Sequence, residues 1–190
     1  MKIRESGMPE EERWNQFFNP VSILKTMGIT NNIKNVAEFG CGYATFTIPT
    51  AKIIRENIYA LDIEPEMIEL TKTKAIKNKL TNIIAIQKDF MADGSGLKDK
   101  SIDYVMLFNI LHLKNPEKLL REANRILKPK GKLGIIHWNY DKTTPRGPPM
   151  NIRPKPEQCI EWAKQAGFNN PEKHNLKPYH YGIVMTKRSS

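Results

Sequence analysis

The chain has 190 residues, with 30 Lys and Arg against 20 Asp and Glu, which gives a net charge of +10. This length suits one domain with a full core and is too short for two ordinary domains, so we expect a single domain over residues 1–190. Two cysteines are too few for a disulfide framework or a cysteine-based zinc site. No apolar run is long enough to span a bilayer, and the charged N-terminus lacks a secretory signal. The sequence therefore predicts a cytoplasmic protein without membrane contact, of undetermined oligomeric state.

The basic excess makes an anionic partner worth considering, nucleic acid included. Lysines dominate this excess, however, and they are scattered over expected helix faces, as at Lys72, Lys74, Lys77 and Lys79. That distribution is typical of a solvated surface. The composition therefore admits a nucleic-acid partner without favouring one.

Residues 1–30 are expected to form an N-terminal helical cap. This segment carries Trp14, Phe17 and Phe18, followed by a short apolar helix from Val21 to Met27. The aromatic side chains either line a ligand site or pack on the edge of a sheet. Trp14 and Phe18 are the candidates for ligand contact.

Short apolar runs alternate with helical patterns from residue 31 onward. Strands are expected near 34–39, 57–61, 82–87, 102–108, 132–138, 171–175 and 180–186, and helices near 44–55, 65–78, 115–127 and 157–166. Asn115 is the expected cap of the third of these helices, with Pro116 at its first position. The pattern predicts an α/β fold, a doubly wound, mostly parallel, seven-stranded Rossmann-like sheet with helices on both faces.

A glycine-rich turn at residues 36–45 is the most informative local feature. A strand containing Glu38 runs into Gly40 and Gly42, and Asp62 ends the next strand. Such a turn lets the backbone approach a nucleoside, while the second acid accepts hydrogen bonds from ribose hydroxyls. The third glycine of a dinucleotide site is missing, Glu38 would repel a pyrophosphate, and no P-loop motif occurs. The turn therefore favours a ligand that carries an ammonium group.

At these residues the chain resembles the class I S-adenosylmethionine-dependent methyltransferases, in particular the small methyltransferase-domain proteins that act on metabolites. The resemblance runs from about Val36 to His137, and Ala44 and Lys130-Gly131 depart from it without removing a contact of Gly40 or Gly42. It implies S-adenosylmethionine as cofactor, S-adenosylhomocysteine as its product and an antiparallel last strand. It assigns the cofactor to residues 31–138, and to the side chains or backbone of Glu38, Gly40, Cys41, Gly42, Asp62, Ile63, Asp89, Phe90 and Asn109.

Residues 139–156 form a proline-rich segment that leaves the expected carboxyl end of the fifth strand. A loop of this length is uncommon in a compact domain unless it is functional or disordered. It carries Arg146 and Arg153, and an arginine fork suits a carboxylate or phosphate. We therefore expect a substrate loop, with Arg146 and the neighbouring Trp138 as candidate contacts and an anionic acceptor as one hypothesis. Residues 157–190 are expected to add the last helix and strands.

Methyl transfer by in-line displacement needs mainly positioning of the two reactants. If the acceptor must lose a proton, His112 or His137 is the candidate base, and Asn109 is a further catalytic candidate at the mouth of the fourth strand. His174 and His180 are interpreted as structural, and no metal-ligand spacing occurs.

The sequence thus predicts methyl transfer to a small-molecule acceptor. Two alternatives stay open at this point, an RNA methyltransferase and a protein that binds S-adenosylmethionine without catalysis. Amino-methylation of adenine or cytosine is disfavoured, because the sequence Phe108-Asn109-Ile110-Leu111 stands where those enzymes carry [DN]-P-P-[YF]. The acceptor itself is not identified by the sequence.

Overall fold

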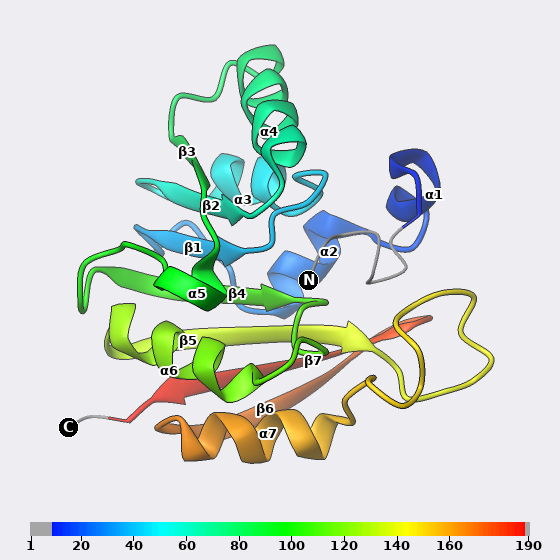
Figure 1. Cartoon of the computed structure of the whole chain (residues 1–190). Helices are drawn as coiled ribbons and strands as arrows, with labels where there is room; N and C mark the ends of the chain where they lie inside the picture. The colour runs from blue at the N-terminus through cyan, green and yellow to red at the C-terminus, as the bar shows by residue number, and fades with distance from the viewer. Residues whose placement is uncertain (1–8, 189–190) are drawn as a thin grey trace.

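Seven strands form one sheet in the order β3-β2-β1-β4-β5-β7-β6 (Figure 1). The computed structural model describes residues 9–188, so the ends of the expected cap and of the C-terminal segment, residues 1–8 and 189–190, lie outside the described residues. Strands β1 to β5 run parallel, and β7 pairs antiparallel with both β5 and β6. The predicted fold and the antiparallel last strand are confirmed. The strands are β1 (Val36–Phe39), β2 (Ile58–Asp62), β3 (Ile83–Gln87), β4 (Ile102–Phe108), β5 (Leu127–Trp138), β6 (Phe168–Leu176) and β7 (His180–Lys187).

Helices cover both faces of this sheet, and each face has its own apolar core. On one face, side chains such as Leu107 and Ile135 pack with Leu119 and Ala163. On the other face, Met106 packs with Ile23 and other apolar side chains. Alternate residues of β4 and β5 serve the two cores because side chains point to opposite faces along a strand. The helices are α1 (Glu11–Asn15), α2 (Pro20–Thr26), α3 (Thr47–Ile53), α4 (Pro65–Lys77), α5 (Phe90–Asp93), α6 (Pro116–Ile126) and α7 (Pro156–Gln165).

Several local expectations need correction. Asn115 makes no side-chain capping bond, because its backbone is in the left-handed region at φ 61° and ψ 57°. The strand expected from residue 132 begins already at Leu127, because this residue pairs with Ile102 of β4. The helix expected from residue 44 begins only at Thr47, because Ala44 still belongs to the glycine-rich turn at φ 57°. The short helix α1 lies within the expected helical cap, whereas α5 was not expected.

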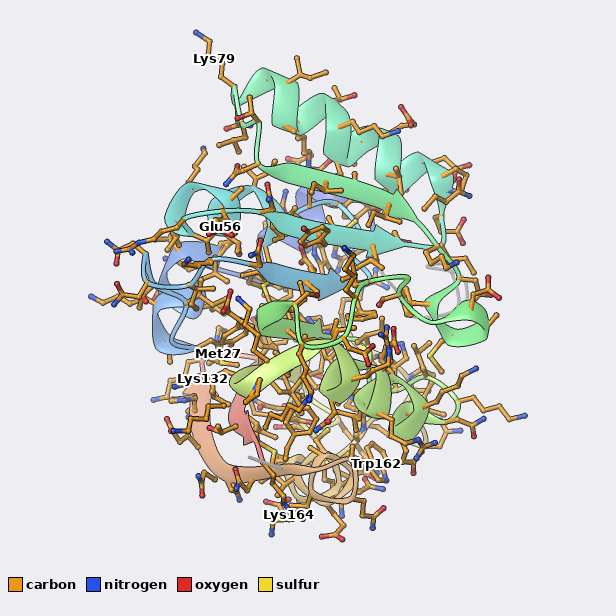
Figure 2. All side chains as sticks on the ribbon, turned by 90° about the vertical axis from the view of Figure 1, so that its left-hand side faces the viewer. Met27, Glu56, Lys79, Lys132, Trp162 and Lys164 are labelled. Carbon is orange, nitrogen blue, oxygen red and sulfur yellow. The ribbon has the colours of Figure 1, made fainter. Side chains whose placement is uncertain are left out.

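Basic side chains are spread over the surface. Figure 2 shows Lys79 and Lys164 at opposite ends of the molecule, and both are exposed. This spread matches the scattering of lysines along the sequence. Among the described residues, no helix has the length and apolar character needed to cross a membrane.

The carboxyl ends of β1, β2, β4 and β5 meet at one edge of the sheet. In Figure 1 the segment that contains α1 and the long yellow loop after β5 both lie at this side of the molecule. Open α/β sheets bind their ligands at this edge, where neighbouring strands continue to opposite faces. The fold therefore places the glycine-rich turn, Asp62 and Asn109 around one site.

Candidate active site

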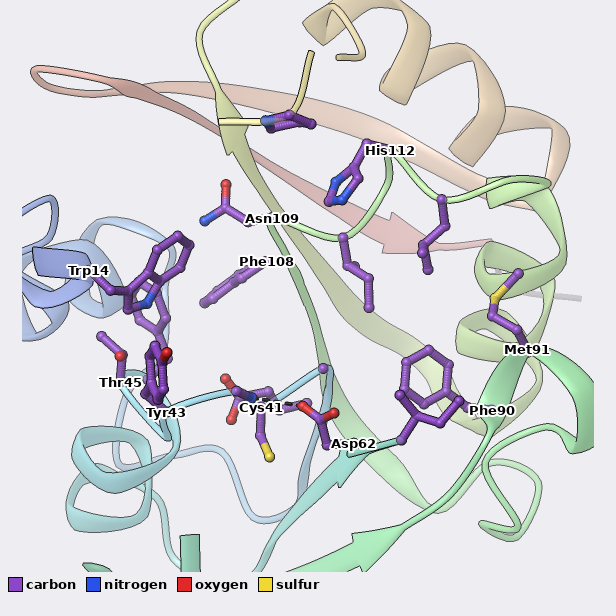
Figure 3. A pocket seen from close by; sticks show the side chains of 18 of the residues that line it. Trp14, Cys41, Tyr43, Thr45, Asp62, Phe90, Met91, Phe108, Asn109 and His112 are labelled. Carbon is purple, nitrogen blue, oxygen red and sulfur yellow. Dashed lines mark hydrogen bonds between the residues drawn. The ribbon is translucent and has the colours of Figure 1, made fainter. Parts of the chain in front are cut away.

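A cleft of about 1100 Å³, part of which is open solvent, lies at the carboxyl edge of the sheet (Figure 3). Its lining includes all nine residues predicted to hold the cofactor, together with His112, Trp14 and Trp138. Phe18, His137 and Arg146 are not among the lining residues. The full lining comprises Trp14, Glu38, Gly40, Cys41, Gly42, Tyr43, Thr45, Phe46, Asp62, Ile63, Asp89, Phe90, Met91, Phe108, Asn109, Ile110, His112, Leu113, Trp138, Gly147 and Pro148.

Glu38 is a buried carboxyl group at the end of β1. Its side chain is 2% exposed and accepts a hydrogen bond of 2.5 Å from the Thr47 hydroxyl at the start of α3. Burial raises the pKa of Glu38 to about 8, and the negative charge of Asp62 adds to the effect. Glu38 is therefore largely protonated at neutral pH in the ligand-free cleft, and a cationic ligand would favour its ionised form.

Asp62 ties the glycine-rich turn to the end of β2. Its Oδ2 accepts from the backbone N–H of Gly42 at 2.9 Å, and its Oδ1 accepts from that of Glu64 at 3.1 Å. Burial raises the pKa of Asp62, and the backbone hydrogen bonds oppose the shift. Each oxygen has lone-pair capacity left for a ligand hydroxyl.

Gly40 gives the turn its close approach to the rest of the cleft. Its φ of 76° is in the region that favours glycine, and an added Cβ would lie 2.9 Å from the Ile110 side chain.

Cys41 is buried beside Gly40, and its Sγ lies 3.6 Å from the Thr71 hydroxyl. Burial raises the pKa of Cys41 well above its usual value. A thiol in this state is a packing group and not a nucleophile.

The end of the cleft beyond Asp62 is apolar except for one carboxylate. Asp89 caps α5, because its Oδ1 accepts from the backbone N–H of Met91 at 3.1 Å and of Ala92 at 2.9 Å. The cap fixes Phe90 and Met91 against the cleft, where Figure 3 shows both side chains. A flat apolar group such as an adenine would fit between such walls.

Asn109 follows β4 with a left-handed backbone, at φ 55°. Neither its amide nitrogen nor its amide oxygen has a hydrogen-bond partner, although both atoms are buried. Figure 3 shows this amide beside the cleft near His112. Buried polar groups are rarely left unpaired, so an unpaired amide in a cleft indicates a ligand contact.

His112 and His137 form a buried pair. His112 Nδ1 lies 3.3 Å from His137 Nε2, and the two side chains are 7% and 0% exposed. His112 lines the cleft, whereas His137 lies behind it on β5. Burial lowers the pKa of His112 to about 4 and holds the pKa of His137 well below its usual value. Both rings are therefore neutral at pH 7.

Aromatic side chains build the wall between α1 and β5. The centroid of the Trp14 ring lies 6.4 Å from that of Trp138 and 4.8 Å from that of Phe18. The ring centroids of Phe18 and His180 are 4.5 Å apart. Trp14 and Trp138 reach the cleft, whereas Phe18 packs against Trp14 outside the lining. The position of α1 is held by hydrogen bonds to the turn, including one of 3.0 Å from the Thr45 hydroxyl to Asn15.

Arg153 holds the loop of residues 139–156 in shape. Its guanidinium is 7% exposed and donates to the backbone carbonyls of Pro148, Asn139, Asp141 and Arg146. The loop in turn places Gly147 and Pro148 against the cleft. Arg146, by contrast, is exposed. The arginine that matters to the site is thus a structural anchor, because its donors are occupied by the loop itself.

Replacing Arg153 with Gln is expected to lower the free energy of unfolding by about 2–4 kcal/mol, since a buried charged donor loses several carbonyl partners. The 139–156 loop should also become sensitive to limited proteolysis. Chemical denaturation and protease digestion measure the two effects. The matched control is Arg146→Gln in the same loop, which should change stability by less than about 0.5 kcal/mol. Equal behaviour of the two variants would contradict the anchoring role.

Some lining residues were missed by sequence reasoning. Phe46 and Phe108 look like ordinary core positions, and nothing in their pattern distinguishes a wall from a core. Gly147 is the one glycine of the proline-rich segment, and a glycine there is a sequence signal of close backbone approach. Its φ is 115°, and an added Cβ would lie 2.8 Å from the Trp138 ring and 2.7 Å from the Arg153 guanidinium. Among the described residues, no cluster of three or more His, Cys, Asp or Glu side chains is arranged to hold a metal ion.

Proteins with similar sequences are named as methyltransferases. A family model described as "Methyltransferase domain" matches residues 37–135. The demethylmenaquinone methyltransferase of Staphylococcus aureus is 26% identical over 171 residues, which cover 82% of this chain and 68% of that protein. A chloroplastic 2-methyl-6-phytyl-1,4-hydroquinone methyltransferase of Oryza sativa is 28% identical over 166 residues, which cover 80% of this chain and 49% of that protein.

The fold has close relatives among solved structures. The crystal structure of a SAM-dependent methyltransferase from Aquifex aeolicus superposes with a TM-score of 0.82 at 24% identity, and the match covers 93% of each chain. At this identity the likeness shows the fold alone. The chain spans between 40% and 68% of the length of the curated relatives considered.

The fold is shared with a solved SAM-dependent methyltransferase, and the cleft lies at the sheet edge where open α/β folds bind their ligands. The chain belongs to the methyltransferase-domain family, whose model covers just over half of its residues.

The cleft fits the cofactor of this family. Glu38 and Asp62 are buried carboxyls without a basic partner among the described residues, which suits a ligand with ammonium and sulfonium cations and ribose hydroxyls. Gly40 leaves room for close backbone approach, and the unpaired Asn109 amide offers a further contact.

Proposed function

We propose that this protein transfers a methyl group from S-adenosylmethionine to a small-molecule acceptor whose reacting part is an apolar ring carrying a hydroxyl group. The observation that carries the proposal is the composition of the cleft beyond the glycine-rich turn. There the lining consists of aromatic and apolar side chains with Asn109 and His112 among them, and no Lys or Arg side chain lines the described cleft.

The nature of this wall argues for a neutral ring and against a carboxylate or phosphate at the reacting end. An anionic group would be desolvated in an apolar wall without a basic partner, which costs several kcal/mol. Trp14 and Trp138 offer ring faces, and Asn109 and His112 offer the hydrogen bonds that a hydroxyl needs. The hypothesis of an anionic acceptor depended on the two arginines of the 139–156 loop. Arg146 is exposed outside the lining, and the donors of Arg153 are occupied by the loop itself.

The relatives support the same class of acceptor. Two of them are named for the methylation of demethylmenaquinone and of a phytyl hydroquinone. Both names describe ring compounds with oxygen substituents. We therefore propose a quinol or another phenol as the acceptor of this chain.

The mechanism assigns a role to each part of the cleft. S-adenosylmethionine supplies an electrophilic methyl group on a sulfonium. Glu38, Gly40, Gly42 and Asp62 would hold its polar groups, while Phe90 and Met91 would enclose the adenine. Trp14, Trp138 and Pro148 exclude water and orient the acceptor ring for in-line displacement. Positioning of this kind is worth up to about 7–11 kcal/mol of the reaction barrier.

Calorimetric titration tests the first half of this proposal. The purified chain is titrated in parallel with S-adenosylmethionine, S-adenosylhomocysteine, NAD and ATP. We expect selective binding of the first two ligands. Binding of NAD or ATP instead would contradict the proposal, and so would binding of none of them.

Transfer of tritiated methyl groups into a cell extract tests the acceptor. After incubation with labelled cofactor, the extract is separated into small apolar molecules, small polar molecules and macromolecules. We expect label in the apolar small-molecule fraction. Label in RNA would support the RNA alternative, and cofactor binding without any transfer would support a non-catalytic protein. A cytoplasmic location stays a prediction, which fractionation of cells expressing the protein would test.

Replacing Asp62 with Ala should weaken S-adenosylmethionine binding by about 1.5–3 kcal/mol, the usual size of a hydrogen bond to a charged group. The backbone N–H groups of Gly42 and Glu64 also lose their acceptor, so the turn itself should loosen. Calorimetry measures the affinity, and circular dichroism checks the fold. Asp62→Asn is the matched variant, and it should retain more affinity than Asp62→Ala because one oxygen remains. Wild-type affinity in the Ala variant would remove Asp62 from the cofactor site.

A further inference from the structure

The hydrogen bond between His112 and His137 allows two arrangements of the ring protons, and the surroundings favour one of them. His112 Nδ1 and His137 Nε2 are 3.3 Å apart, so one ring donates its N–H to the other. In a neutral pair only one nitrogen of each ring carries a proton. Burial keeps both rings neutral, as their lowered pKa values indicate. The choice of donor therefore also decides which nitrogen of His112 carries its proton on the other edge of the ring.

The surroundings of His137 distinguish the two arrangements. Its Nδ1 is buried and has no hydrogen-bond partner. If His112 donated to His137, the His137 proton would lie on this Nδ1, where the Trp138 backbone offers only a contact outside hydrogen-bond geometry. If His137 donates through Nε2, only a lone pair is left unpaired. Buried N–H groups without an acceptor are rarer in proteins than under-used acceptors, so the second arrangement is favoured.

We propose that His137 is a positioning residue that fixes His112 in the tautomer protonated on Nε2, so that His112 presents a hydrogen-bond donor to the acceptor and does not act as its base. The inference rests on the proposed function, because it concerns the acceptor end of the same cleft. His112 lines this end, and the unpaired Asn109 amide lies beside it in Figure 3.

Two neutral donors, His112 Nε2–H and the Asn109 amide, are then both available at the acceptor end of the cleft. Such a pair stabilises negative charge on oxygen without itself carrying charge. The hydroxyl proton of the acceptor leaves to solvent water through the open part of the cleft. The resulting oxyanion, or the ring carbon conjugated with it, then forms the bond to the methyl carbon, and the electron pair of the broken carbon–sulfur bond stays on sulfur. If the ring carbon is methylated, its hydrogen leaves to water as a proton. This arrangement selects phenols and enols, which ionise more readily than aliphatic alcohols.

Long-range proton–nitrogen NMR correlation on protein labelled with ¹⁵N-histidine tests the tautomer directly. We expect wild-type His112 to be protonated on Nε2 and unprotonated on Nδ1 throughout pH 5.5–8. The titratable and charged groups that also face His137 are His180 and Tyr181 from β7 and Arg153 from the loop. Of these, His180 is varied in the control below. A His112 protonated on Nδ1, or doubly protonated within this range, would overturn the inference.

Two variants separate the role of His137 from general packing. His137→Phe keeps a ring of similar size and removes the donor, and we expect His112 to become a mixture of tautomers. His180→Phe is the matched control, because His180 is also buried but makes no hydrogen bond with His112, and the tautomer should not change. An unchanged His112 in His137→Phe would overturn the positioning role. If His137→Phe does not fold, the wild-type spectrum still decides the tautomer.

Calorimetry with S-adenosylmethionine on the same samples keeps the two proposals apart. Failure of the wild-type protein to bind the cofactor would remove the proposed function, whatever the tautomer. Binding of the cofactor with the opposite tautomer would remove this inference alone.

Discussion

Glu38→Gln is expected to stabilise the ligand-free protein by about 3 kcal/mol at pH 7, which corresponds to a rise in Tm of roughly 5–10 °C. The physical reason is the buried carboxyl of Glu38, whose pKa is raised by burial to about 8. Folding must keep this group protonated, whereas the unfolded chain ionises freely. Gln keeps an oxygen that accepts from the Thr47 hydroxyl and has no proton to lose.

The pH dependence of this effect has a definite sign. The unfolded-state pKa of Glu38 is near 4.5 and the folded-state value is about 8. Between these values the folded state binds more protons, so wild-type stability falls as the pH rises from about 4.5 to 8 and is constant above. The advantage of Glu38→Gln should accordingly vanish near pH 4.5 and reach its maximum above pH 8.

Thermal unfolding of both proteins at several pH values measures this difference. Glu69→Gln, an exposed substitution on α4, is the matched control and should behave like the wild type. A variant less stable than the wild type at pH 7 would show that Glu38 is ionised and satisfied in the free protein.

S-adenosylmethionine affinity is expected to rise by about tenfold per pH unit between pH 6 and 7.5, because the cationic ligand binds the ionised form of Glu38 and displaces its proton. The rise should end near pH 8, where Glu38 is already ionised and the α-amino group of the ligand begins to lose its own proton. Glu38→Gln should abolish this dependence and weaken binding at pH 8 by about 1.5–3 kcal/mol, the size of a lost hydrogen bond to a charged group.

Calorimetry in two buffers of different ionisation enthalpy counts the protons released. We expect close to one proton per wild-type complex at pH 6.5 and none for Glu38→Gln. Release of one proton by the variant would assign the effect to another group, of which Asp62 is the first candidate because burial also raises its pKa. Glu38→Gln is thus expected to raise the free energy of unfolding and to weaken cofactor binding. The same substitution therefore separates the two roles of Glu38.

The fold was largely predictable because its signals are local. The strands expected near 57–61, 82–87 and 102–108 lie within one residue of the observed β2, β3 and β4. Errors occur where tertiary contacts override the local pattern. The segment after α6 has the composition of a turn, yet it begins β5, because Leu127 finds a partner in Ile102 of the neighbouring strand.

The site was predictable in part. All nine expected cofactor residues line the cleft, since the glycine-rich turn and the strand ends fix them from within short stretches of sequence. Arg146 and Arg153 were indistinguishable in the sequence, because both lie in one proline-rich loop. Only the packing of that loop shows which guanidinium is buried among carbonyls and which is exposed.

The sequence by itself determined the class of the protein. Periodicity specifies the alternating strands and helices, and a glycine turn with an acid before it and an acid on the next strand predicts a nucleoside-type cofactor. The tertiary structure decided which side chains line the acceptor end of the cleft. This end is lined by residues from segments far apart in the chain, namely Trp14, His112, Trp138 and Pro148. Their spacing in the sequence does not indicate that they line the same cleft. The pKa of Glu38 and the pairing of His112 with His137 likewise arise from burial and proximity, which exist only once the sheet has folded.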